Sequence, residues 1–579
     1  MILQALTHYY EALLVNGEVA RPGWVEAKVP FALQLDEDGR LIRLLHLQVE
    51  QQRGKKLVMV PRTLSVPAPA KRSMNIAASF LCDKCSYMLG VSDGDGEERA
   101  LKCFAGSKEL HQTLLRDIDA PAARAVVRFF AQWEPSRASE HPALQEDWSE
   151  LVKGGNLVFW CGEQPVTQIG EIQQVWQRQY ERSGGKEVFC PVIGRRAPLA
   201  RLHPSIKGVF GAQSSGASLV SFNAPAFCSY EHEQGENAPT SEYAAFAYTS
   251  ALNRLIGDRD HMCRVGDTTI VCWAEDAQSA YQDFVMESLY DDNYGERDIL
   301  QALQRLSAGE AIDWQQARLK PEMRFYVLGL APNAARLSVR FFWTNSFGTM
   351  ARNVYKHYVR LNIVRPAFDK VETLSIWRLT RETVNLNART PEPNPRLAGE
   401  LLLAVLNNGF YPATLLNGVA QRIRAERNLT RGRAAILKAY YLQNSKDEQL
   451  KEVMTVNLNE QSKYLPYVLG RMFAVLEYIQ AEANPGINTT IKDRYFNAAS
   501  SMPLTVFPVL INLAQKHLAK LSKDEKRAGL GAYLERKLTE LNGRIDQTLP
   551  KHMTLAEQSA FQIGYYHEVQ RRYAKKEEQ

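Results

Sequence analysis

The sequence predicts an α+β protein, with a mixed α/β N-terminal region followed by an all-α C-terminal helical bundle. Short apolar runs bounded by Gly and Pro alternate with segments of helical period up to residue 386. A stretch with three prolines in five residues follows within 387–396, and helical period dominates from there onward. The 579 residues, 45% apolar and 23% charged, are typical of a globular chain of two or three domains.

The first 230 residues predict short elements of both kinds. Leu3, Leu6 and Tyr10 share one helical face, and no basic region or cleavage site accompanies them, so a docked helix is favoured over a signal peptide. Alternating residues around the turn DEDG predict a small antiparallel β region over 25–70. Further patterns predict helices at 74–90 and 108–133, and strands at 157–160, 188–193, 206–210 and 219–222.

The middle of the chain predicts a helix over 241–256 with Ser241 as its N-cap, and a strand at 268–273. Two β-rich runs around APNAAR, followed by an amphipathic helix at 348–358, predict a ββα unit. The predicted domains are an N-terminal α+β domain at 1–320, a ββα-type unit at 321–386, a Pro-rich linker at 387–396, and a helical bundle at 397–579.

No metal, cofactor or membrane segment is predicted. No window of eighteen apolar residues occurs, so we expect no membrane contact and a cytoplasmic protein. The eight cysteines fit reduced thiols in that compartment. Cys82 and Cys85 have the spacing of half a zinc site, but no second pair follows, and two thiols in a helix is the favoured interpretation.

No catalytic site is convincing either, and we expect no enzyme activity. AQSSG around Ser214 is similar to the nucleophile motif of serine hydrolases, but a β-like run follows it where that motif needs a helix. GVFGAQSSG also lacks the Gly-Lys-Ser/Thr ending of a phosphate-binding loop. A serine hydrolase that uses Ser214 stays as the alternative from the enzyme class.

One long segment contains no carboxylate. Residues 188–230 hold no Asp or Glu, although about five are expected in 43 positions of a chain with 64 acids in 579 residues. Within it, 201–227 is rich in Gly, Ser, Gln and Asn and carries Lys207. Such groups bind phosphates and base edges, and missing acids remove repulsion, so a nucleic-acid surface is predicted. A buried β core with polar turns is the alternative.

The positive charge is concentrated in the last third. Residues 396–579 hold 26 Lys and Arg against 18 Asp and Glu, whereas the remainder holds 44 against 46. A polyanion is therefore a candidate partner of this part, and a solvated helical surface is the alternative. The densest basic run, beside two tyrosines, is a candidate strand-binding surface with the residues Arg422, Arg424, Arg427, Arg431, Arg433 and Lys438.

Several of these stretches resemble a known family. They are MILQALTHYYEALL, KRSMNIAASFLCDKCSYMLG, RLHPSIKGVFGAQSSGASLVSFNAPAF with its continuation to residue 256, FYVLGLAPNAARLSVRFFW and YPATLLNGVAQRIRAERNLTRGRAAILKAYY. The chain resembles, from residue 1 to about residue 566, the large subunit of the type I-C CRISPR Cascade complex. The cysteines of LCDKCSY depart from the residues expected there, which further disfavours zinc.

The resemblance implies a non-catalytic subunit of an RNA-guided surveillance complex. Such a subunit would sit at the 5′ handle of the CRISPR RNA, bind the protospacer-adjacent motif in duplex DNA and help open the strands, supporting R-loop formation. Implied partners are backbone subunits, the CRISPR RNA-processing subunit, small subunits, the displaced strand and a recruited helicase-nuclease. The C-terminal bundle would resemble the small subunits. An internal start at Met454 would yield a 126-residue fragment of that kind.

Named residues follow for the motif duplex. Lys207, Gln213, Ser214 and Ser215 are predicted to lie against it, with Asn223 near. A second contact loop is predicted from its basic and amide groups before a helix, and consists of Lys71, Arg72 and Asn75. The main alternative is a generic nucleic-acid-binding scaffold outside CRISPR interference.

Overall fold

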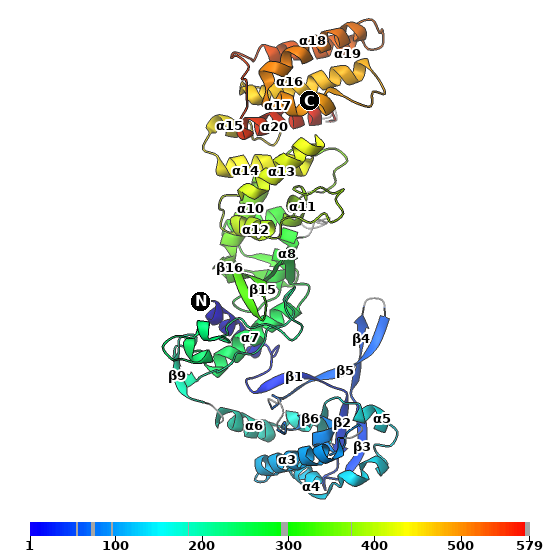
Figure 1. Cartoon of the computed structure of the whole chain (residues 1–579), viewed down its shortest axis with the longest axis vertical. Coiled ribbons are helices and arrows are strands. Elements are labelled where there is room, and N and C mark those ends of the chain that lie inside the picture. The colour runs from blue at the N-terminus through cyan, green and yellow to red at the C-terminus, as the bar shows by residue number, and fades with distance from the viewer. Residues whose placement is uncertain are drawn as a thin grey trace. The chain divides into compact units, whose positions relative to one another are not determined.

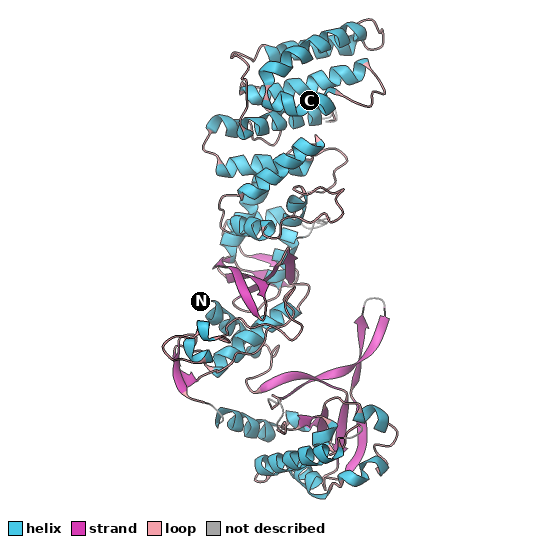
Figure 2. Ribbon diagram, in the orientation of Figure 1, coloured by secondary structure: helices cyan, strands magenta, loops and turns pink. Residues whose placement is uncertain are grey.

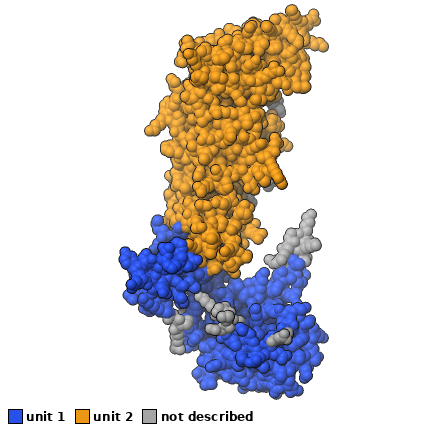
Figure 3. Space-filling view, viewed as in Figure 1, with its two compact units in different colours: residues 1–204, 220–251 blue, residues 205–219, 252–579 orange. Residues whose placement is uncertain are grey.

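The computed structural model describes residues 1–53, 56–70, 76–93, 96–182, 185–290, 299–371 and 373–573. The chain forms two compact units, coloured separately in Figure 3. Unit 1 is Met1–Pro204 with Val220–Ala251, and unit 2 is Ser205–Leu219 with Leu252–Gln579. The predicted boundaries at 320 and 387–396 both fall inside unit 2. Sheets in the first part and helices in the last confirm the α+β class (Figure 2).

The larger sheet of unit 1 has strands in the order β3-β2-β7-β6, with β8 paired to β7. Strands β2 and β7 are parallel, and the other pairs are antiparallel. Helices α3 and α4 pack with this sheet around Phe129, Phe130 and Phe159 (Figure 1). The bounds are β2 Phe31–Leu35, β3 Leu41–His46, β6 Cys82–Asp83, β7 Leu157–Cys161, β8 Gln164–Pro165, α3 Glu97–Leu115 and α4 Pro121–Gln132.

A second sheet of unit 1 confirms the antiparallel region predicted over 25–70. Its order is β1-β5-β4, from β1 (Trp24–Val29), β4 (Gln48–Arg53) and the long β5 (Lys56–Pro67). Strand β5 pairs with β1 at its C-terminal half and with β4 at its N-terminal half. The continuous strand β5 is therefore hydrogen-bonded to both β1 and β4.

The remaining elements of unit 1 include the docked N-terminal helix. Helix α1 (Ile2–Val15) places the Tyr10 ring 6.3 Å from Tyr243 and 5.9 Å from Phe246, both on α7. The Ser241 hydroxyl accepts from the Ala244 amide at 3.2 Å, which confirms the predicted N-cap. The bounds are α5 Trp148–Val152, α6 Gly170–Arg182, β9 Glu187–Cys190, β10 Arg195–Pro198 and α7 Glu242–Gly257, the last of which ends in unit 2.

Unit 2 begins with an antiparallel sheet of order β11-β12-β15-β16. The predicted ββα unit is confirmed as β15, β16 and α10, with Ser346 capping α10 through the Thr349 amide at 3.2 Å. A small hairpin, β13 with β14, and helices α8 and α9 complete this region. The bounds are β11 Met262–Val265, β12 Thr268–Ala274, α8 Ala280–Tyr290, α9 Ile299–Ser307, β13 Ile312–Trp314, β14 Ala317–Leu319, β15 Arg324–Asn333, β16 Arg336–Ser346 and α10 Phe347–Leu361.

The rest of unit 2 is helical, as predicted. One hydrophobic core runs without a break from the sheet into these helices, from Val265 to Tyr566. Helices α16 and α20 pack together along their lengths. The bounds are α11 Ile376–Arg381, α12 Leu397–Leu406, α13 Ala413–Glu426, α14 Arg431–Asn444, α15 Glu448–Glu452, α16 Leu465–Ala483, α17 Ile491–Ser501, α18 Pro503–Leu521, α19 Ala528–Asn542 and α20 Leu555–Arg571. Among the described residues, no helix has the length and apolar character needed to cross a membrane.

Several local predictions are wrong. Residues 206–210 and 219–222 form no strand, and only single bridges, Ile206 with Ala217 and Ser218 with Arg336, occur there. The described part of 74–90 is helical only at α2 (Cys85–Met88), and Cys82 lies in β6, so the two thiols do not share a helix. The helix predicted at 108–133 is two helices, because the chain turns before Pro121.

Candidate nucleic-acid interface

The part of the acid-free segment that belongs to unit 2 is a loop, residues 205–219, which we call the 205–219 loop. Asn253, on α7, fixes its first turn from both sides. The Lys207 amide donates to Asn253 Oδ1 at 2.8 Å, and Asn253 Nδ2 donates to the Ser205 carbonyl at 3.2 Å. The bridge between Ile206 and Ala217 closes the loop on itself. The loop is therefore held by its own backbone and by neighbouring groups, of which the Asn253 amide is one.

The glycines of this loop have a structural explanation. Gly208, Gly211 and Gly216 have φ of 85°, 75° and 98°, in the left-handed region that disfavours other residues. A β-carbon on Gly208 would lie 2.9 Å from Ile256, and one on Gly216 would lie 2.8 Å from the Ser205 side chain. Close approach by a ligand is not needed to account for these glycines.

The side chains of the loop divide by polarity. Ile206, Val209 and Ala217 are buried and anchor the loop, whereas Lys207, Gln213, Ser214 and Ser215 are exposed. These four polar residues are therefore not buried, although exposed polar turns beside buried apolar residues are also part of the alternative interpretation. The structure brings all four together in one exposed loop.

Two neighbours of the loop were missed by the sequence analysis. The Phe210 amide donates to Thr269 Oγ1 at 3.1 Å, and the guanidinium carbon of Arg264 lies 3.1 Å from the centre of the Phe210 ring. Arg264 is exposed, and its Nε donates to the Gly266 carbonyl at 3.1 Å. A held guanidinium thus lies beside the loop. No sequence pattern indicates this neighbour, because Arg264 lies in the short strand β11 and is 54 positions from Phe210.

Asn223 is exposed, but it belongs to unit 1. It begins a loop that Asn237 braces: Asn237 Oδ1 accepts from the Ser229 amide at 2.9 Å, and its Nδ2 donates to the His232 carbonyl at 3.0 Å. Tyr230, in that loop, is fully exposed at a φ of 54°. Lys71, Arg72 and Asn75 lie outside the described residues.

The basic run at 422–438 is largely structural. Arg431 and Arg433 are buried and paired: Arg431 lies 3.0 Å from Asp369, and Arg433 lies 2.6 Å from Glu426. Lys438 is also buried, and its Nζ donates to the Arg360 carbonyl at 2.9 Å. Burial lowers the pKa of Lys438 to about 8. These three side chains make contacts inside the fold, so they do not form part of the exposed strand-binding surface that was predicted.

The other members of that run are closer to the surface. Arg422 lies 3.5 Å from Glu426 along α13, and Arg424 donates to Gln558 Oε1 at 3.0 Å. Arg427 is exposed at the end of α13, where its φ of 50° terminates the helix. Of the six predicted contacts, only Arg424 and Arg427 are exposed residues.

The structure offers no support for hydrolase chemistry at Ser214. Ser214 lies in a turn with no helix after it, so the strand–turn–helix geometry of a nucleophile elbow is missing. His203, a candidate base, belongs to unit 1, where its Nδ1 lies 2.6 Å from the Tyr248 hydroxyl. Burial lowers the pKa of His203 to about 4.

Metal ligation has no site in the described part of the chain, where no group of three His, Cys, Asp or Glu side chains is arranged to hold an ion. Burial raises the pKa of the Cys82 thiol to about 12, which disfavours the thiolate that a metal requires.

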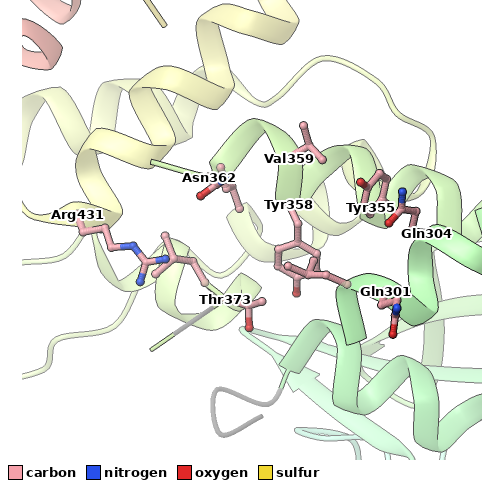
Figure 4. Close-up of a pocket in the computed structure, with 11 residues that line it drawn as sticks. Gln301, Gln304, Tyr355, Tyr358, Val359, Asn362, Thr373 and Arg431 are labelled. Atoms are coloured by element: carbon pink, nitrogen blue, oxygen red, sulfur yellow. The ribbon is translucent and has the colours of Figure 1, made fainter. Parts of the chain in front are cut away.

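A cavity of about 440 Å³ opens between α9, α10 and the start of α14 (Figure 4). Amide, hydroxyl and phenol groups line it, and among the described lining residues Arg431 carries the one charge. Its described polar groups can donate and accept hydrogen bonds, as the few polar groups of a ligand pocket do. Its polar lining residues are Gln301, Gln304, Tyr355, Tyr358, Asn362, Thr373 and Arg431.

Comparison with known proteins identifies the family. A comparison with curated proteins finds no match. The model of a family described as CRISPR-associated protein (Cas_Csd1) matches residues 6–573, which is nearly the whole chain. This agrees with the resemblance carried by the quoted segments. The chain therefore belongs to the Cas_Csd1 family of CRISPR-associated proteins, the large subunits of the type I-C Cascade complex.

Proposed function

We propose that this large subunit recognises the protospacer-adjacent motif in duplex DNA through the 205–219 loop, and helps to open the duplex there. One observation carries the proposal. A loop without carboxylates presents Lys207, Gln213, Ser214 and Ser215 to solvent while its apolar residues are anchored in the fold. A surface of this kind suits a polyanion that is read at close range.

Each side chain suits a part of that task. The Lys207 ammonium neutralises phosphate, which supplies affinity independent of sequence. The Gln213 amide can donate to and accept from a base edge, which supplies discrimination, and the two serine hydroxyls donate to phosphate or bases. The Asn253 hydrogen bonds and the left-handed glycines hold the loop before binding, so little conformational entropy is lost when DNA arrives.

Arg264 extends this surface. Its guanidinium is held over the Phe210 ring and by the Gly266 carbonyl, and a guanidinium with a fixed plane binds phosphate oxygens in pairs. Asn223, and the loop of Lys71, Arg72 and Asn75, stay as further predicted contacts of the duplex.

The division of labour assigns sequence reading beyond the motif to the CRISPR RNA. Strand cleavage then falls to a recruited helicase-nuclease, and this subunit needs no catalytic residue or cofactor. It would work in the cytoplasm with backbone subunits, the CRISPR RNA-processing subunit and small subunits. Its helical part would help hold the displaced strand and so support the R-loop.

The small subunits have a candidate source in this same chain. Met454 follows α15, so a fragment that starts there contains the whole of α16 to α20. In the full chain the Met454 side chain is buried. Expression of the intact gene should give a short C-terminal product by mass spectrometry. Absence of that product would remove Met454, and with it the internal start, from the proposal.

The loop is tested with Lys207→Ala combined with Gln213→Ala in the assembled complex. Binding is measured at fixed salt against duplexes with a randomised flanking motif. Loss of one base-reading contact alone is worth about 1–3 kcal/mol, so we expect a loss of roughly tenfold or more for the preferred motif, with flatter preference across motifs. The matched control is Lys523→Ala with Gln461→Ala, which removes the same groups from other exposed positions.

Unchanged motif-dependent binding by the loop variant would sink the proposal. A generic nucleic-acid scaffold, the main alternative, would purify without CRISPR RNA and backbone subunits and would show no preference among flanking motifs. Labelling of Ser214 by a fluorophosphonate probe would instead support the hydrolase alternative.

A further inference from the structure

A second cavity in unit 2, of about 540 Å³, is enclosed by α11, the segment 366–374 before it, and the turn between α13 and α14. We call it the Trp377 cavity. It has the volume of an ordinary small-ligand site. Aromatic, aliphatic and guanidinium groups line it together, among them Phe368, Trp377, Arg381 and Tyr566.

The carboxylates among the described lining residues of this cavity have partners inside the fold. Asp369 lies 3.0 Å from Arg431, and Glu382 accepts from the Thr430 hydroxyl at 2.8 Å. Arg433 lies 3.3 Å from Glu382 and 2.6 Å from Glu426. Two of the arginines that the sequence suggested as strand contacts therefore pair with the acids of the cavity wall, and the described lining holds four arginines against three carboxylates.

Aromatic and basic groups remain on the exposed side. Phe368 is 86% exposed and Trp377 is 52% exposed, which is unusual for side chains of this size. The guanidinium carbon of Arg381 lies 4.5 Å from the centre of the Trp377 ring, so the indole is held from one side while much of it stays open. Lys370 and Arg427, each next to a lining residue in the chain, are exposed as well.

We propose that the Trp377 cavity binds an unpaired base of single-stranded nucleic acid. The base stacks on Trp377 and Phe368, and Arg381 with its basic neighbours receives the adjoining phosphates. Stacking on an aromatic ring needs an exposed base face, and a strand presents such a face only when it has left the duplex. This site deepens the proposed function and rests on it for the source of the single strand.

The neighbouring cavity supports a path longer than one base. Leu374 and Arg431 line both cavities, so the two adjoin on either side of these residues. Gln304, Asn362 and Thr373 supply amide and hydroxyl groups to the first cavity, in the view of Figure 4. Groups of this kind hydrogen-bond to base edges and sugars whatever the sequence.

A protein partner is the competing occupant, because Trp and Arg are also enriched at protein interfaces. The open indole with a guanidinium on one face, and the excess of four arginines over three carboxylates in the described lining, favour an anionic chain with flat bases. Experiments can distinguish a nucleic-acid occupant from a protein occupant. A protein site would be needed for assembly and would be indifferent to free oligonucleotides.

The first experiment measures binding of fluorescein-labelled oligothymidylate and oligouridylate, neither complementary to any guide, to the full-length chain. We expect Trp377→Ala to weaken binding by roughly 5- to 150-fold, the range for loss of one base–aromatic stack, and Trp377→Phe to retain most of it. The salt dependence should stay the same for Trp377→Ala, and its slope should fall by about 0.7 for Arg381→Gln. The DNA and RNA probes show which sugar the site prefers.

The control is Tyr533→Ala on α19. Tyr533 is 45% exposed, and its ring lies 5.8 Å from the guanidinium carbon of Arg536, so it repeats the aromatic–arginine pair away from the lining of the Trp377 cavity. Its loss should leave binding unchanged. Equal losses for Trp377→Ala and Tyr533→Ala would overturn the proposal, because binding would then be a property of any exposed pair.

Photocrosslinking of wild-type protein tests the site without a substitution. Oligonucleotides carrying 5-iodouracil should attach to peptides that contain Phe368 or Trp377. Crosslinks confined to other peptides would overturn the proposal, as would full oligonucleotide binding by Trp377→Ala together with failed Cascade assembly. The Lys207→Ala, Gln213→Ala variant is measured in parallel. It should keep single-strand binding, so loss of duplex recognition and loss of the Trp377 site are distinguishable.

Discussion

At the scale of the residue, Arg433 shows how a basic side chain becomes structural. It is buried between Glu382 and Glu426, and burial raises the pKa of Glu382 despite its hydrogen bond from Thr430 and the nearby arginine. Removal of one partner from a buried ionic group leaves the other uncompensated.

We therefore expect Arg433→Met to lower the free energy of unfolding by about 3–5 kcal/mol. Arg427→Met, at the exposed C-cap of α13 six residues before Arg433, should change it by no more than about 0.5 kcal/mol. Denaturant titration of the full chain measures both. Equal stability of the two variants would show that the buried network does not support the fold.

His261 makes a pH-dependent contribution to the stability of the fold. Its Nδ1 lies 3.0 Å from Asp258 and its Nε2 lies 2.7 Å from Asp283. Burial acts to lower its pKa, but hydrogen bonds to the two carboxylates outweigh burial and raise the pKa above 6.5. Protonated His261 therefore stabilises the fold fully below pH 6.5, and this contribution is lost as pH rises through the raised pKa.

His261→Asn should remove that part of the pH dependence. The unfolding temperature of His261→Asn at pH 6 should then fall toward the unfolding temperature of the same variant at pH 9. His552→Asn, at an exposed position, should keep the wild-type dependence of unfolding temperature on pH. A wild-type pH profile for His261→Asn would contradict the assignment.

At the scale of the element, the crossing of α16 and α20 depends on two glycines. A β-carbon on Gly470 would overlap the carbonyl oxygen of Phe561, and one on Gly564 would overlap the carbonyl oxygen of Tyr467. These obstacles are backbone atoms, which cannot rotate away as a side chain can. The two helices approach this closely only because neither carries a side chain at the crossing.

Gly470→Ala should therefore lower the free energy of unfolding by at least about 1–3 kcal/mol, the usual penalty of overpacking. Gly399→Ala, in α12 with nothing within 4 Å of its added β-carbon, should raise it by about 0.4–1 kcal/mol. Chemical denaturation compares the two. A neutral Gly470→Ala would mean that the helices can separate at no cost.

Elements with a strong period were predictable, and the loops were not. The ββα unit, α1, α7 and the C-terminal helices follow from apolar spacing, because each buries one face. The short run 206–210 was predicted as a strand, yet its Ile206 and Val209 are anchors that fix a loop. The missing acids singled out the 205–219 loop, but a buried β core would lack acids as well, so they did not decide that Lys207 and Gln213 are exposed. Arg433 and Lys438 were not, since periodicity alone does not say which basic side chains find internal partners.

At the scale of the molecule, unit 2 has one core across the Pro-rich segment 387–396. Asn353 of α10 donates to the Leu406 carbonyl at 2.6 Å, and His357 Nδ1 lies 2.7 Å from the Tyr411 hydroxyl, both in buried positions. Helices α12 and α14 pack directly on α10. The segment predicted as a linker thus joins two parts of a single core.

Limited trypsin cleavage at Arg389 and Arg396, in exposed backbone, should therefore leave the two fragments associated. They should co-elute in gel filtration under native conditions and separate only in denaturant, because the broken peptide bond bears none of the buried contacts. Separation of the fragments would mean that the helices after residue 396 form an independent domain. A fragment that starts at Met454 differs, because it contains α20 but not α14. In the full chain the Ser559 hydroxyl of α20 donates to the Tyr441 hydroxyl of α14 at 3.4 Å. The fragment should therefore expose this face of α20, where another subunit can bind.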